Sequence, residues 1–263
     1  MTTILITNDD GIDAPALRPL AGAMKQMGAV AVVAPNRERS WIGKAISRHR
    51  EIRVTELEDA DFPMWAVDGY PADCVQVGAF GLLGNRPDLV VSGINIGANK
   101  GSAFSTGSGT IAAAIEASNI GVPGLAFSAM SDGPWRQWGP WAASPDSIGM
   151  WSRLAEVAAD IAGTVLDGGF PGGVDALSVN LPAAADVNTQ RRVTTLARTS
   201  YGSLFTGRDG VYRHDWDGIL HTNGDSPNSD IEVLDAGIVS ITPIRMATTA
   251  PLDPNLQRRL ERR

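Results

Sequence analysis

Two adjacent carboxylates, Asp9 and Asp10, follow a short apolar run at residues 4–6. A solidly apolar run of this kind is typical of a buried strand, and open α/β sheets bind ligands at the carboxyl ends of their strands. Neighbouring carboxylates raise each other's pKa unless a positive partner is present, and a hard divalent cation is a suitable partner. A simple turn at residues 8–11 is the competing interpretation, but it leaves the second carboxylate unexplained.

A second oxygen donor follows the next apolar run, residues 30–34. Ser40 ends the polar loop 36–40 and offers a neutral hydroxyl group. The basic residues of this loop, together with Lys44, are also suited to binding a phosphate group. Considered alone, the segment fits a solvated charged loop equally well.

A glycine-rich segment, residues 91–101, follows a third strand-like run and contains Asn95 and Asn99. Its small residues permit a ligand to approach the backbone, and its amides offer carbonyl oxygens. The segment matches neither the P-loop nor the dinucleotide fingerprint. Three strand ends therefore offer oxygen ligands without Cys or paired His, which favours Mg²⁺, Mn²⁺ or Ca²⁺ over zinc. The proposed ligands are Asp9, Asp10, Ser40 and Asn95.

Small and hydroxyl residues at 105–110 lead into an alanine-rich stretch with helical spacing. The amino terminus of a helix attracts anions through its free N–H groups and its dipole. Ordinary capping by Ser108 or Thr110 is the alternative, and it accounts for one hydroxyl only. A cation beside an anion cradle is typical of phosphoryl transfer or phosphate hydrolysis.

Apolar strand-like runs alternate with helical patterns over most of the chain, which predicts βαβ units and a mainly parallel, doubly wound sheet. The expected strands are residues 3–7, 29–34, 63–67, 87–91, 123–128 and 175–180. The first expected helix begins after Asp13 and Pro15. The other expected helices cover residues 71–83, 110–118 and 148–165.

Two polar segments interrupt this alternation. Residues 35–62 form a long excursion, and residues 199–235 are rich in Gly, Asp, Asn and Ser, which predicts a hairpin or arm. A final strand is expected at 239–244, followed by a short polar helical tail. We therefore predict a catalytic core at residues 1–185 and a C-terminal segment at residues 186–263.

The overall composition limits the possible partners and location. The chain has 263 residues, a net charge of −7 and a pI near 5.0, which argues against broad binding of nucleic-acid polymers. Its single cysteine, Cys74, excludes an intrachain disulfide and fits a buried thiol in a reducing compartment. The amino terminus lacks a signal-peptide pattern, and no apolar run approaches the roughly 18 residues of a membrane span. We expect a cytoplasmic protein without membrane partners.

Several stretches of the chain resemble the SurE family of stationary-phase survival nucleotidases. They lie in family order over nearly the whole chain. They are ILITNDDGIDAPAL at 4–17, APNRERS at 34–40, GYPADCVQVG at 69–78, VSGINIGANKG at 91–101, SGTIAAAIE at 108–116, VNLP at 179–182 and SDIEVLDAGIVSITPI at 229–244.

The resemblance implies a metal-dependent phosphatase that hydrolyses nucleoside 5′- and 3′-monophosphates. It also implies a Rossmann-like core and a C-terminal arm, a β-hairpin with a helical part, that is used in oligomerisation to a homodimer or homotetramer. Mg²⁺ or Mn²⁺ is the expected cofactor, and Ca²⁺ can occupy the same site. By family pattern the metal ligands are Asp9, Asp10, Ser40 and Asn95, the catalytic residues are Asp9, Asp10 and Asn95, and the phosphate-binding residues are Asn99, Ser108, Gly109 and Thr110.

Two other classes of function compete with this hypothesis. A receiver-like signalling module also places paired acidic residues at strand ends, but it needs a further Asp where this chain has Ser92 and Asn95. A nucleotide-binding regulatory module without hydrolysis is the other alternative, since a fold alone does not assign function.

The chain departs from the family pattern at several aromatic positions. Trp41 follows Ser40, where relatives carry Gly or a small residue, and Trp135, Trp138 and Trp141 occupy an unusual segment. These three tryptophans either contact a nucleobase, close a lid, or serve as core or subunit-contact residues.

Overall fold

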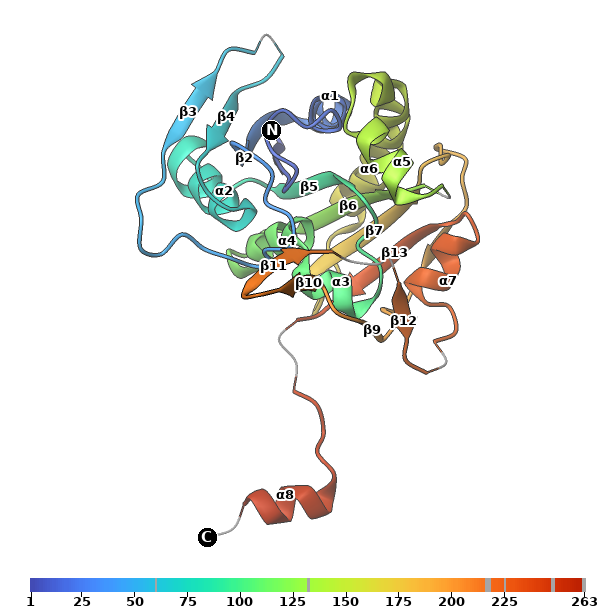
Figure 1. Ribbon diagram of the computed structural model, residues 1–263. Coiled ribbons are helices and arrows are strands. Elements are labelled where there is room, and N and C mark those ends of the chain that lie inside the picture. The colour runs from blue at the N-terminus through green and yellow to red at the C-terminus, as the bar shows by residue number, and fades with distance from the viewer. Residues whose placement is uncertain (60, 132, 216–218, 225, 247–248, 262–263) are drawn as a thin grey trace.

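The computed structural model describes residues 1–59, 61–131, 133–215, 219–224, 226–246 and 249–261. Over these residues, nine strands form one sheet in the order β3-β4-β2-β1-β5-β6-β7-β13-β8 (Figure 1). Their bounds are β1 (Thr3–Thr7), β2 (Ala29–Pro35), β3 (Val54–Leu57), β4 (Met64–Val67), β5 (Leu89–Ile96), β6 (Gly124–Met130), β7 (Ala176–Pro182), β8 (Arg191–Val193) and β13 (Val239–Ile244).

The six central strands run parallel, from β4 through β2, β1, β5 and β6 to β7. Strand β3 pairs antiparallel with β4, and β13 pairs antiparallel with β7 and parallel with β8. The chain builds the sheet outward from β1 in one direction and then from β5 in the other. The β1–β5 boundary is therefore the topological switch point, where open α/β sheets bind ligands. This architecture confirms the predicted α/β fold.

Helices cover both faces of the sheet because the strands are apolar on both sides. Along β1, Ile4 and Ile6 face one layer while Leu5 faces the other. The first layer holds α1 (Leu17–Met24), which continues into η1 (Lys25–Met27), and α6 (Ile148–Gly168). The second layer holds α2 (Pro71–Val77), which continues into η2 (Gly78–Leu82), and α4 (Gly109–Asn119).

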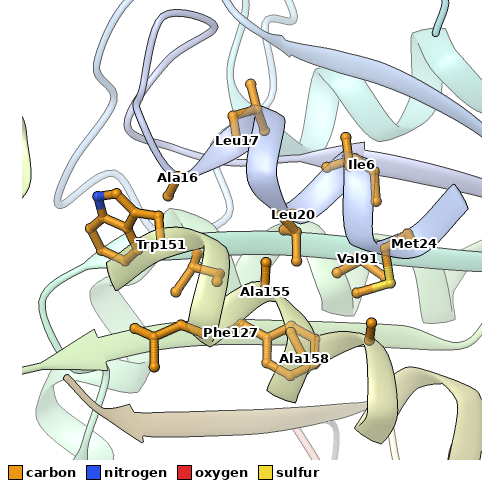
Figure 2. Close-up of a cluster of buried hydrophobic side chains, with 14 of the residues drawn as sticks. Ile6, Ala16, Leu17, Leu20, Met24, Val91, Phe127, Trp151, Ala155 and Ala158 are labelled. Atoms are coloured by element: carbon orange, nitrogen blue, oxygen red, sulfur yellow. The ribbon is translucent and has the colours of Figure 1, made fainter. Parts of the chain in front are cut away.

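Figure 2 shows how the first layer packs. Leu20 and Met24 of α1 meet Ala155 and Ala158 of α6 above Phe127 of the sheet. Small alanines on α6 face large side chains on α1, so the two helices approach closely without leaving voids. This core lies directly beneath the strands whose ends carry Asp9 and Asn95, and it fixes the position of those ends.

Four strands and α-helices within residues 1–185 differ from the sequence-based expectations, and in the C-terminal segment β8 and α7 (Asp230–Asp235) were not predicted either. Strand β3 lies inside the predicted excursion 35–62, where its mostly exposed side chains give no apolar signal. Strand β5 extends to Ile96 instead of ending at 91, with a register irregularity between Ser92 and Asn95. Two short helices, α3 (Gly101–Gly107) and α5 (Trp135–Ala142), were not predicted, because glycine and Pro140 obscure their helical pattern. The 3-10 helix η3 (Pro145–Ser147) connects α5 to α6.

The C-terminal segment contains paired strands outside the main sheet, as expected for the arm. Strand β10 (Phe205–Arg208) pairs with β11 (Val211–His214), and β9 (Thr199–Tyr201) pairs with β12 (Leu220–Thr222). Parts of the predicted arm, residues 216–218 and 225, and the last two residues of the tail lie outside the described residues.

The rest of the C-terminal segment returns to the sheet and then leaves it. Helix α7 (Asp230–Asp235) precedes β13, and α8 (Pro254–Leu260) lies away from the body of the molecule in Figure 1. The division at residue 185 stays a prediction. Among the described residues, no helix is both long enough and apolar enough to cross a bilayer.

Candidate active site

The turn after β1 is held by the side chain of Asn8. Its Nδ2 donates to the Gly11 carbonyl oxygen at 2.9 Å, and its Oδ1 accepts from the Gly11 N–H at 3.1 Å. Gly11 adopts a φ of 100°, and a Cβ there would lie 2.9 Å from the Arg37 carbonyl carbon. Only glycine fits this position, so the loop after β2 packs directly against the turn that carries the two carboxylates.

Asp9 and Asp10 point toward different neighbouring elements. Asp9 is 3% exposed, and its Oδ1 accepts from the Thr110 hydroxyl at 2.6 Å. The half-buried Asp10 accepts from the Ile96 N–H at 3.2 Å through Oδ2. One carboxylate is therefore anchored to α4 and the other to the end of β5.

The two carboxylates have no cationic side-chain partner among the described residues. Burial raises the pKa of Asp9 to about 6, although hydrogen bonds from Thr110 and nearby backbone oppose the shift. Burial and the charge of Asp9 raise the pKa of Asp10 well above its ordinary value, and Glu38 adds to the effect. Neither Asp9 nor Asp10 forms a salt bridge with a described residue. Two desolvated, mutually repelling carboxylates are the setting in which a divalent cation is favoured.

Ser40 and Asn95 lie in segments that contact the carboxylate turn. The N–H of Arg39, which precedes Ser40, donates to the Asp9 carbonyl oxygen at 2.7 Å. The Ser40 hydroxyl donates to Glu38 Oε1 at 2.7 Å. Asn95 precedes the Ile96 N–H that binds Asp10, and its Nδ2 donates to the Gly97 carbonyl oxygen at 2.7 Å. The structure thus brings the loops of all four predicted ligands to the switch point of the sheet.

This donor set fits a hard cation that also accepts neutral ligands. Among the described residues, no group of three or more His, Cys, Asp or Glu side chains is arranged to hold a metal. A cation at the switch point would therefore combine the two carboxylates with hydroxyl, amide and water oxygens. Mg²⁺ and Mn²⁺ commonly bind through few carboxylates in this manner.

The amino terminus of α4 lies against Asp9. A Cβ added at Gly109 would lie 2.8 Å from the Asp9 Cβ, so glycine is required for the close approach. The Ser108 hydroxyl accepts from the Ile111 N–H at 3.1 Å and caps the helix, while the Thr110 hydroxyl is bound to Asp9. The positive end of an eleven-residue helix therefore points at the carboxylate turn, where a bound anion would also be stabilised.

Asn99 is buried and is hydrogen-bonded to two strands of the sheet. It is 8% exposed, its Nδ2 donates to the Ser128 hydroxyl at 2.8 Å, and its N–H donates to Asn180 Oδ1 at 2.9 Å. These bonds tie the segment after β5 to β6 and β7. A role for Asn99 in phosphate binding stays a prediction.

Two side chains that shape the site were not predicted from the sequence. Asn8 closes the carboxylate turn, and Glu38 accepts from Ser40 and raises the pKa of Asp10. Both lie within the loops that contain the predicted ligands. Asn and Glu are common in exposed loops, so their residue types alone did not mark them.

Two of the three tryptophans in the unusual segment lie near the Asn95 loop. A Cβ added at Gly97 would lie 3.4 Å from the Trp135 ring, and Trp135 and Trp138 have ring centroids 5.8 Å apart. Trp138 is 9% exposed and belongs to the core, whereas Trp135 is 57% exposed. The core interpretation therefore holds for Trp138.

Known proteins match the chain along most of its length. Residues 4–203 match the family described as Survival protein SurE. The chain belongs to the SurE family. It is 39% identical over 250 residues to a protein of Pelobacter propionicus named 5′-nucleotidase SurE, covering 94% of both chains. A protein of the same name from Archaeoglobus fulgidus is 36% identical over 259 residues, covering 95% of this chain and 94% of the relative.

A solved SurE structure shares the fold. The crystal structure of the SurE protein from Aquifex aeolicus superposes with a TM-score of 0.74 at 31% identity, covering 94% of each chain. The match includes the C-terminal segment as well as the parallel core. The resemblance inferred from the short SurE motifs is therefore confirmed over the whole fold.

Proposed function

We propose that this protein is a 5′-nucleotidase, a metal-dependent phosphatase that hydrolyses nucleoside 5′- and 3′-monophosphates to nucleoside and phosphate. The proposal rests above all on the adjacent carboxylates of buried Asp9 and half-buried Asp10, with Asp9 bound at the amino terminus of α4. Two relatives with the name 5′-nucleotidase SurE are 39% and 36% identical to this chain, and each match covers at least 94% of both chains.

The proposed site assigns a separate task to each element. Asp9 and Asp10, with Ser40 and Asn95, would hold a divalent cation, and Mg²⁺ or Mn²⁺ fits their oxygens. When bound there, it would supply positive charge for the phosphate group and would lower the pKa of a coordinated water. The first turn of α4 binds the phosphate group of the substrate through its N–H groups.

Hydrogen bonds made by neighbouring side chains keep the acidic groups in place, which supports this assignment. The Asn8 side chain fixes the turn, and Thr110 holds the Asp9 carboxylate against the start of α4. The carboxylates are therefore oriented before any substrate binds. Preorganised charge is the largest single contribution in many hydrolytic sites.

The decisive experiment measures phosphate release from AMP by protein treated with EDTA, with and without added Mn²⁺. We expect release only with the cation, and a loss of about 100-fold or more in kcat/KM for Asp9→Asn, in the range found when one stabilising group is removed. Asp88→Asn is the matched control. Asp88 lies just before β5, at the opposite end of the parallel strands from Asp9, and accepts a hydrogen bond from the Thr3 N–H. Cation-independent release, or an Asp9→Asn variant with near wild-type activity, contradicts the proposal.

Assembly and location complete the proposal. We further propose that the chain functions in the cytoplasm as a homodimer or homotetramer, with the C-terminal segment contributing to the contact. Light scattering of the full chain and of a chain ending at residue 246 tests the contribution of the part of this segment that contains α8. Equal masses for the two chains would count against a role for that part.

A further inference from the structure

Trp41 has a strained backbone conformation at the edge of the candidate site. It follows Ser40 directly and adopts a left-handed backbone with a φ of 59°. Few large residues adopt this conformation, and it costs of order 1 kcal/mol or more. Its side chain is nevertheless 41% exposed, so it does not compensate by complete burial. Strain at such positions is often associated with a functional surface.

Three aromatic side chains from separate elements hold the Trp41 ring. Its centroid lies 5.5 Å from that of Phe104 at 86° and 5.9 Å from that of Tyr201 at 78°. His214 lies 5.4 Å away at 54°. The two near-perpendicular contacts, with Phe104 and Tyr201, and the tilted contact with His214 fix the plane of the indole ring. Trp41 nevertheless stays 41% exposed.

The Trp41 loop is also bound to the segment that leads into the phosphate-binding helix. A Cβ added at Gly107 would lie 3.5 Å from Cε3 of Trp41. The Gly43 N–H donates to the Gly107 carbonyl oxygen at 2.9 Å. Gly107 immediately precedes Ser108, which caps α4. The indole ring therefore borders both the proposed metal loop and the proposed phosphate loop.

We propose that Trp41 stacks on the nucleobase of the substrate and makes the site selective for nucleotides over phosphomonoesters that lack a base. This inference rests on the proposed nucleotidase function. With its phosphate at the start of α4, a nucleoside monophosphate places its base one ribose away, within reach of a residue that borders Gly107. Every base presents a flat π-face, so an aromatic wall recognises nucleotides as a class.

The test compares AMP with ribose 5-phosphate, which carries the same phosphate and sugar without the base. The ratio of kcat/KM for AMP to that for ribose 5-phosphate should fall about 5- to 150-fold in Trp41→Ala, the range for loss of one base–aromatic stack. The fall should appear mainly in KM for AMP. Trp41→Phe retains an aromatic face and should recover most of the ratio.

Trp141→Ala is the matched control, because Trp141 is 42% exposed and lies on α5. An equal loss for both substrates in Trp41→Ala would show that the ring only supports the Ser40 loop, and would overturn the inference. An unchanged ratio would overturn it as well.

The outcome for the inference is separable from that for the proposed function. If the wild-type protein releases phosphate from neither compound, the proposed function fails. Calorimetric binding of AMP and ribose 5-phosphate to wild type and Trp41→Ala then decides the inference. Tighter binding of AMP that depends on Trp41 supports it, and equal affinities overturn it.

Discussion

Helix α4 has a buried carboxylate at each end, Asp9 against its amino terminus and its own Glu116 near its C-terminal end, and the two differ in charge compensation. Near its C-terminal end, Glu116 is 4% exposed but is bound by Lys44 at 2.5 Å, by Asn119 at 3.0 Å and by Gln76. Burial raises the pKa of Glu116, but these donors outweigh it and leave the pKa below its usual value. Asp9, at the amino-terminal end, has its pKa raised.

The difference distinguishes a structural carboxylate from the proposed metal-binding pair. Glu116 ties the loop containing Lys44 and helix α2 to α4, and the protein supplies its positive charge. At the other end of α4, Asp9 and Asp10 have no comparable partner among the described residues. The fold supplies a cationic side chain for Glu116 but none, among the described residues, for Asp9 and Asp10. This contrast indicates that the positive partner at the switch point is a bound ligand.

The largest expected effect is stabilisation by a cation at the carboxylate pair. Mn²⁺ at 100 times its Kd should add about 2.7 kcal/mol to the free energy of unfolding, raising Tm by about 5–10 °C. Thermal melts of EDTA-treated protein with increasing Mn²⁺ provide the measurement. Asp9→Asn should lose the shift, while Asp88→Asn should keep it. A shift of the same size in Asp9→Asn would place the cation elsewhere.

Removing one negative charge should have opposite effects at the Asp9–Asp10 pair and at Glu116. In metal-free protein, Asp10→Asn should raise the free energy of unfolding, because it removes a desolvated and repelled charge. Glu116→Gln should lower it by about 1–3 kcal/mol, because donors then lose their acceptor. Urea unfolding of both variants and wild type tests the contrast. If both variants changed the free energy of unfolding in the same direction, the proposed difference between the carboxylate pair and Glu116 would be wrong.

The smallest expected effect is a pH dependence specific to Glu116. Its pKa in the folded protein is below the ordinary 4.5, so its contribution is fully present above pH 4.5 and is lost as the pH falls through the folded pKa. The stability difference between wild type and Glu116→Gln should therefore be constant above about pH 5 and shrink below about pH 4.5. Urea unfolding from pH 3 to pH 7 measures it. A difference that persists at pH 3 would show that the effect comes from packing rather than charge.

Local patterns predicted the parallel core and the carboxylate turn. The apolar run of β1 and the two residues after it lie next to each other in the chain, so their joint meaning is readable from sequence. Asn95 was expected in a loop, whereas it lies on β5 beside a register irregularity that no residue pattern announces.

Other features depend on residues that are far apart in the chain. Asn99 is bound by Asn180, 81 positions away, and Glu116 is held by Lys44 from another loop. The aromatic contacts of Trp41 likewise join the β2 loop to Tyr201 and His214. Such pairings are set by the final packing of the sheet and arm, which the spacing of residues along the chain does not encode.

The placement of β13 has a consequence for biosynthesis. This strand fills the gap between β7 and β8, yet its residues, 239–244, are synthesised after those of every other described strand of the sheet. Until then a nascent chain exposes the unpaired edge of β7, a template for aggregation. A product terminated shortly before residue 239 would keep that edge permanently open. Synthesis through residue 244 is therefore a condition for closing this edge of the central sheet.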